Sequence, residues 1–242
     1  MVCDTLVYHP SLNKLVNYLE TTNGREKVLR LLQYLSRFLA VQRSSTQFKA
    51  LQMQFTVVRK FLRFLKPISS FQAACKNYDN KLNKKDLVMY WSNIIKNLAN
   101  GLYLTFDQIN LLRMLNVVPK TYFTANLVPR WSNWFWLYGI LSSLVINFKS
   151  IQQNQMKIVA ILKERRSSAD NEEDKEEDKK YLEQAYRQRY LAVRKLIWDL
   201  LDAFIVLNNL NFLNNKDGYI ALSGVATSLF GIQDLWKAVS TK

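Results

Sequence analysis

The 242-residue chain has little glycine, proline, cysteine or histidine: 6 Gly, 4 Pro, 2 Cys and 1 His. Scarcity of the residues that form tight turns and break helices favours long helices over sheets. A single histidine and two distant cysteines disfavour zinc sites and Cys-His nucleophile pairs. The sequence also has no Gly-rich phosphate loop and no Gly-x-Ser-x-Gly motif. We therefore expect an all-α protein that is not an enzyme and holds no metal or cofactor.

Acids are scarce as well, with 19 Asp and Glu against 34 Lys and Arg, which gives a formal net charge of +15. Seven of these acids lie between Asp170 and Asp178, so the remainder of the chain carries 33 bases against 12 acids. Such an excess predicts an anionic partner, either phospholipid or nucleic acid. Because the bases accompany large apolar faces and no nucleic-acid-binding motif is present, we expect an anionic phospholipid membrane and no nucleic acid.

Residues 48–66, FKALQMQFTVVRKFLRFLK, contain no acid and precede Pro67, which is expected to end a helix there. Apolar residues that step by three and four place one face of this helix against lipid. That face comprises Phe48, Leu51, Phe55, Val58, Leu62 and Leu65, with Phe61 beside it. The bases Lys49, Arg59, Lys60, Arg63 and Lys66 fall on another sector and are candidates for binding anionic lipid. The stretch is therefore predicted to be an amphipathic membrane-binding helix.

Two later segments have membrane-like character. Residues 131–148 form an 18-residue run without a charge, which suits a membrane span and a buried core helix about equally. The run 219–236 repeats small residues every four positions, a spacing that lets helices approach closely. These predicted helix-packing residues are Ser223, Gly224, Thr227, Ser228 and Gly231.

The segment 163–180, KERRSSADNEEDKEEDKK, is charge-dense and is predicted to be a disordered, solvated linker. Ser167 and Ser168 follow two arginines and are candidate phosphorylation sites, with an unmodified linker as the alternative. The linker separates an N-terminal helical region, residues 1–162, from a C-terminal helical hairpin, residues 181–242. Cys3, near the N-terminus, is a candidate for an intermolecular disulfide, with a free thiol as the simpler alternative.

Several segments together resemble the fungal peroxin eleven family. They include GREKVLRLLQYLSRFLAVQ (24–42), QFTVVRKFLRFLKP (54–67), FDQINLLRMLNVVP (106–119), PRWSNWFWLYGILS (129–142), WDLLDAFIVLNNLNFL (198–213) and YIALSGVATSLFGIQDLW (219–236). The resemblance implies a peroxisomal membrane protein that self-associates, elongates the organelle and promotes its fission and proliferation. It also implies two partners, a dynamin-related GTPase and a tail-anchored fission adaptor, and it matches the family's membrane-remodelling helix to residues 48–66.

We therefore expect an all-α, membrane-associated helical bundle with amphipathic helices and one to several hydrophobic membrane-embedded helices. Its expected function is to curve the peroxisomal membrane by inserting the helix at 48–66. The alternative is a pore for small metabolites, because charges interrupt apolar helices at Lys96, Asp107, Arg113, Asp199 and Asp202. A soluble helical scaffold is a third reading.

Overall fold

The computed structural model describes residues 9–80, 86–167 and 172–239, and every regular element in these ranges is helical. This agrees with the all-α prediction. The chain forms α2 (Pro10–Glu20), α3 (Thr22–Gln42), α4 (Thr46–Leu62), α5 (Lys66–Asp79), α6 (Leu87–Met114), the π-helix η2 (Phe123–Leu127), α7 (Val128–Ser167), α8 (Glu172–Asn209) and α9 (Asp217–Ala238).

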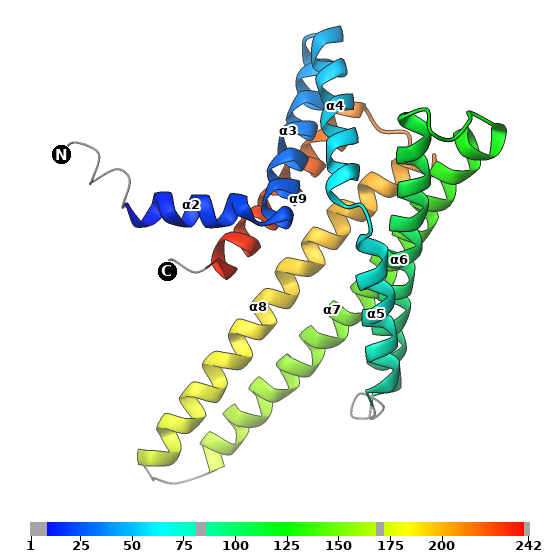
Figure 1. Ribbon diagram of the computed structural model, residues 1–242. Helices are drawn as coiled ribbons and strands as arrows, with labels where there is room; N and C mark the ends of the chain where they lie inside the picture. The colour runs from blue at the N-terminus through cyan, green and yellow to red at the C-terminus, as the bar shows by residue number, and fades with distance from the viewer. Residues whose placement is uncertain (1–8, 81–85, 168–171, 240–242) are drawn as a thin grey trace.

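The long helices α7 and α8 form the frame of the fold. They run side by side, and their far halves extend as a two-helix arm beyond the other helices (Figure 1). Helix α6 packs along the first half of α7, and α5 packs on α6. The apolar core lies where α7 and α8 meet, around Leu137, Ile140 and Val206. This packing holds one wall of the candidate site rigidly.

The hairpin of α3 and α4 forms the opposite wall, at the end of the molecule away from the arm (Figure 1). Helix α9 packs on α3, and Tyr34 of α3 joins Ile205 and Ile220 in a second apolar cluster. The approach is close: a Cβ atom on Gly224 would lie 2.1 Å from Cδ1 of Tyr34. The start of the described chain is tied to its end by Tyr18 of α2, whose ring centroid lies 5.8 Å from that of Trp236.

Helix α4 ends at Leu62, earlier than the predicted end at Lys66, so the prediction of one helix over 48–66 is wrong at its C-terminal end. Leu65 adopts a left-handed conformation with φ of 62°, and the chain then turns into α5. Pro67 lies in the first turn of α5, where a missing N–H removes no helical hydrogen bond. The turn redirects the chain so that α5 can pack on α6.

The charged segment 163–180 also differs from its prediction. Helix α7 continues to Ser167 and α8 begins at Glu172, so the described parts of this segment are helical and not disordered. Glu, Lys and Arg have good helix propensity, and continuity with two long packed helices lets a charge-dense stretch remain helical. Ser168 and Cys3 lie outside the described residues, and Ser167 is the last residue of α7.

Polarity is distributed unusually across this bundle. Its buried residues include charged side chains such as Glu26, Arg30 and Asp202, while large apolar side chains such as Phe148 and Ile68 are exposed. Within the described ranges, no helix is both long enough and apolar enough to cross a membrane. The predicted membrane-embedded character of 131–148 and 219–236 therefore stays a prediction. Both segments lie inside longer helices, α7 and α9.

Candidate functional site

Helix α4 turns its apolar side outward. Phe61 and Leu65 each have 59% of their surface exposed, and Leu51 and Val58 are also exposed. The other predicted members of the apolar face, Phe48, Phe55 and Leu62, are half-buried. In a helix on the surface of a water-soluble domain, the apolar side would face the core. The predicted lipid-facing residues thus lie at or near the outer surface of α4, where lipid could reach them.

The basic side of α4 turns inward. Arg59 and Lys60 are buried, Arg63 is half-buried, and only Lys49 and Lys66 of the predicted lipid-binding bases are exposed. This arrangement departs from a strip of bases facing headgroups. In this conformation Arg59, Lys60 and Arg63 are engaged by acids of the protein itself, so their predicted role in binding lipid stays a prediction.

Two carboxylates from neighbouring helices hold these bases. Arg59 donates to Oε1 of Glu26, on α3, from Nε at 3.1 Å and from Nη2 at 2.7 Å. Lys60 Nζ donates to Oδ1 of Asp107, on α6, at 2.6 Å. Arg63 Nη2 donates to the other oxygen of Asp107 at 2.8 Å. Helix α4 is therefore fastened to α3 on one side and to α6 on the other.

A third carboxylate binds a second buried arginine of the site, Arg30. Arg30 Nη2, on α3, donates to Oδ1 of Asp202 at 2.6 Å and to the hydroxyl of Thr227 at 2.9 Å. Trp198 Nε1 donates to the second oxygen of Asp202 at 3.1 Å. Because Asp202 and Trp198 belong to α8 and Thr227 to α9, Arg30 joins three helices.

The site's electrostatics follow from this crowding. Burial by itself would raise the pKa of Glu26, but the charges of Lys27 and Arg59 outweigh it and hold that pKa well below its usual range. Burial lowers the pKa of Lys27 to about 8, because the attraction of Glu26 offsets only part of the desolvation. Burial also lowers the pKa of Lys60, despite its contact with Asp107. The ammonium groups here are thus less strongly protonated than in water.

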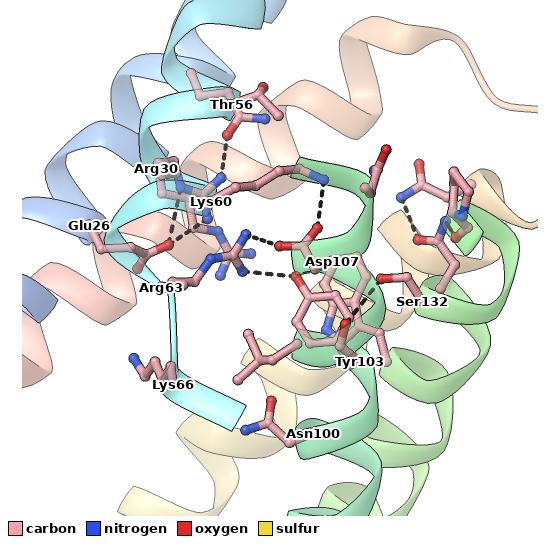
Figure 2. A pocket seen from close by; sticks show the side chains of 18 of the residues that line it. Glu26, Arg30, Thr56, Lys60, Arg63, Lys66, Asn100, Tyr103, Asp107 and Ser132 are labelled. Carbon is pink, nitrogen blue, oxygen red and sulfur yellow. Dashed lines mark hydrogen bonds and ion pairs between the residues drawn. The ribbon is translucent and has the colours of Figure 1, made fainter. Parts of the chain in front are cut away.

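These side chains line a cavity of about 390 Å³ between α3, α4, α6 and α7 (Figure 2). Its walls carry two acids, Glu26 and Asp107. They also carry six bases, which are Lys27, Arg30, Arg59, Lys60, Arg63 and Lys66. Neutral polar groups complete the walls, among them Tyr103, whose hydroxyl accepts from Arg63 Nη1 at 2.9 Å. We call this space the basic cavity.

A second cavity of about 270 Å³ lies between α6, α7 and α8 and shares Asn100 and Trp136 with the basic cavity. It contains Lys96 and Asp199, two of the charges that suggested a pore. Asp199 accepts from Asn147 Nδ2 at 2.7 Å, and burial raises its pKa. Of the other three pore candidates, Asp202 also lines this cavity while paired with Arg30, Asp107 lines the basic cavity, and Arg113 lies against the side chain of Asn110.

The predicted helix-packing residues gather where α9 meets α3 and α8. Gly224, Thr227, Ser228 and Gly231 are buried, and Ser223 is half-buried. A Cβ atom on Gly231 would lie 2.9 Å from Cδ of Lys27. At Gly231, as at Gly224, a larger residue would therefore collide with a side chain of α3. Cys75 is exposed and forms no disulfide.

Sequence reasoning missed the role of Glu26 and the inward direction of the bases on α4. Glu26 is an acid in an otherwise basic helix, and Asp107 is an isolated acid in a long apolar helix. An acid in such surroundings signals a buried partner, since an unpaired buried carboxylate is costly. That signal could have indicated that some α4 bases are used inside the protein.

Comparison with known proteins gives a consistent result. The family model described as Peroxisomal biogenesis factor 11 (PEX11) matches residues 12–236. The chain is 55% identical to "Peroxisomal membrane protein PMP27" of Saccharomyces cerevisiae, over 98% of this chain and 100% of that one. It is 31% identical to "Peroxisomal membrane protein PMP30B" of Candida boidinii, over 98% and 99% of the two chains. It is 22% identical to "Peroxisomal biogenesis factor 11" of Schizosaccharomyces pombe, over 94% and 96%. No solved structure matches the chain.

Proposed function

Because the chain belongs to the peroxisomal biogenesis factor 11 family and is a peroxisomal membrane protein, we propose that it curves and elongates that membrane. In this proposal the outer side of α4 inserts into one leaflet, and the resulting curvature promotes fission and proliferation of the organelle. The observation that carries the proposal is the orientation of α4, with large apolar side chains outside and the charges of Arg59 and Lys60 inside. Lipid can cover the apolar side without any base leaving its partner.

The strongest part of this surface is the junction patch, which we define as Phe61, Phe64, Leu65 and Ile68. These side chains are 48% to 66% exposed, and they surround the turn between α4 and α5. Complete burial of one large apolar side chain contributes about 1.5–3 kcal/mol, so covering four that are about half exposed contributes about 3–6 kcal/mol gross. A shallow insertion of this kind enlarges one leaflet only, and the area mismatch favours positive curvature.

The test uses the full-length protein added to anionic vesicles and electron microscopy of tubules. Phe61→Glu places a charge in the junction patch and is expected to abolish tubulation while leaving helix content unchanged. Met156→Glu is the matched control, because Met156 is similarly exposed, at 57%, and belongs to the second half of α7, which extends away from α4 (Figure 1). Tubulation by the Phe61→Glu protein at the wild-type level would refute insertion through this patch.

The proposed partners follow from the same function. Many copies must act together to bend a membrane, so the chain is proposed to bind itself. A dynamin-related GTPase and a tail-anchored fission adaptor are proposed to complete fission. Crosslinking of the full-length protein in peroxisomal membranes would detect these contacts, and recovery of the monomer alone would argue against all three.

A second candidate function is a pore for small metabolites. It is favoured by cavities inside the bundle that adjoin one another and share lining residues. The basic cavity shares Asn100 and Trp136 with the cavity around Asp199. It shares Pro129, Asn133 and Asn209 with another cavity of about 450 Å³. Purified protein in planar bilayers separates the two functions, because discrete conductance without vesicle tubulation favours the pore and tubulation without conductance favours curvature.

A further inference from the structure

The basic cavity has too few acids for its bases. Six bases line it, and in the described part of the chain five of them form ion pairs with three carboxylates: Glu26, Asp107 and Asp202. The cluster therefore carries a formal charge of about +3 in a partly desolvated space, where like charges repel more strongly than in water. Excess charge of this kind requires either water or a bound anion to offset it.

The cavity also has too few hydrogen-bond acceptors for its donors. Among the described side chains, the Nε–H groups of Arg30 and Arg63 are buried and have no hydrogen-bond partner. Lys66 Nζ is held only by a neutral group, the amide oxygen of Asn23, at 2.8 Å. Lys27 Nζ lies 3.3 Å from a carboxylate oxygen of Glu26, the same side chain that serves Arg59. An ammonium group has three donors, so both lysines have donors left for a ligand.

The shape of the site suits a small ligand with several oxygens. Its volume of about 390 Å³ falls within the range of ordinary ligand pockets. The bases approach the space from the wall formed by α3, α4, the turn after α4 and the start of α5, and they face Asp107 and Tyr103 of α6 (Figure 2). Lys66 is exposed at its edge and Lys27 keeps 24% of its side chain exposed, so the cavity is open to a ligand from outside.

We infer that the basic cavity binds a small phosphate-bearing anion, either a soluble organic phosphate or the headgroup of a phospholipid. A phosphate group carries close to two negative charges and three strong acceptor oxygens, which matches the deficit better than a single carboxylate. Guanidinium groups recognise phosphate oxygens in pairs, and lysines add point charge. Asn100 and Asn110 in the walls supply hydrogen bonds for the remaining polar atoms of the ligand. This inference does not depend on membrane curvature by α4.

The test measures pyrophosphate binding to the full-length protein in neutral detergent by isothermal titration calorimetry. The variant is Lys27→Gln with Lys66→Gln, which removes two cavity charges but keeps all three carboxylates and the three bases of α4. Losing one charged hydrogen bond costs roughly tenfold in affinity, so the double variant is expected to bind at least about tenfold more weakly. Circular dichroism checks that it folds. If it does not fold, Lys66→Gln alone serves, because Lys66 is exposed.

The matched control is Arg43→Gln with Lys76→Gln. These bases are exposed, lie at the end of α3 and in the last turn of α5, and do not line the cavity. The control loses the same net charge and is expected to keep wild-type affinity. Equal weakening in both variants would assign binding to general surface charge and would overturn the inference. Failure of the wild-type protein to bind in both arms of the experiment would also overturn it.

A second arm distinguishes the two sources of phosphate. The same three proteins are mixed with neutral phosphatidylcholine vesicles that contain or lack phosphatidylinositol 4-phosphate, and vesicle flotation is measured. Binding that depends on this lipid and on Lys27 and Lys66 identifies a lipid headgroup as the ligand. Pyrophosphate binding without such lipid dependence identifies a soluble phosphate. Either result supports the cavity as a phosphate site.

Discussion

The substitution Asp107→Asn tests the carboxylate that two bases of the site share. Both oxygens of Asp107 are used, one by Lys60 at 2.6 Å and the other by Arg63 at 2.8 Å. Asparagine has the same shape but no charge, and its amide nitrogen would point at one of two buried cations. The variant therefore loses the shared counter-charge, while Lys60 stays buried in α4 and Arg63 stays half-buried just after it.

The size of the effect follows from burial. The side chain of Asp107 is 10% exposed, as is that of Lys60, and Arg63 is 14% exposed. Removing one partner from a buried ion pair costs about 3–5 kcal/mol. That cost is a large share of the total stability of a domain, which is about 5–15 kcal/mol. Because Asp107 is the contact that fastens the end of α4 to α6, the loss is expected to concentrate in α4 and the turn after it.

Urea unfolding of the full-length protein in neutral detergent, followed by circular dichroism, measures the change in free energy. Hydrogen exchange of the α4 amides measures local release. Asp217→Asn is the control, because Asp217 pairs with Arg37 but its side chain is 50% exposed, and such surface pairs contribute about 0–1 kcal/mol. If the two variants differ by less than about 1 kcal/mol, the idea that buried charge pairs fasten α4 is refuted.

Two further predictions concern packing and pH. Gly224→Ala should destabilise the protein by about 1–3 kcal/mol, because its Cβ would collide with Tyr34 at 2.1 Å. Gly139→Ala is the control and should not destabilise it, because the nearest neighbour of its Cβ is 3.9 Å away. Thermal melting of both proteins measures the difference. The affinity of the basic cavity for sulfate should fall as pH rises through about 8, because Lys27 in the folded protein loses its proton there. Sulfate is the probe because its own charge is constant in this range. The charged groups that face Lys27 are Glu26, Arg30 and Arg59. The unfolded chain keeps that proton up to about 10.5, so Lys27 should also make the protein more stable as pH rises from about 8 to 10.5, and both trends should be weaker in the Lys27→Gln protein.

The helical content and the two sides of α4 were predictable because both are local properties. Scarce Gly and Pro and the three-and-four spacing from Phe48 to Leu65 are visible within a few turns of helix. The end of α4 was not predictable in the same way. A proline marks a boundary but can also open the next helix, and the break at Leu65 depends on α5 finding its place on α6. The helicity of 163–167 and 172–180 likewise depends on the long helices to which these stretches belong.

By itself, the sequence determined that the chain is helical, strongly basic and similar throughout to a family of peroxisomal membrane proteins. Only the tertiary structure decided which side of α4 faces inward. The deciding carboxylates, Glu26 and Asp107, lie 33 and 47 residues from Arg59 and Lys60, and Asp202 lies 172 residues from Arg30. Pairing across such separations depends on how the helices pack. Periodicity along one helix can separate its apolar side from its basic side, but it contains no information about which acids the packed bundle will bring to the bases.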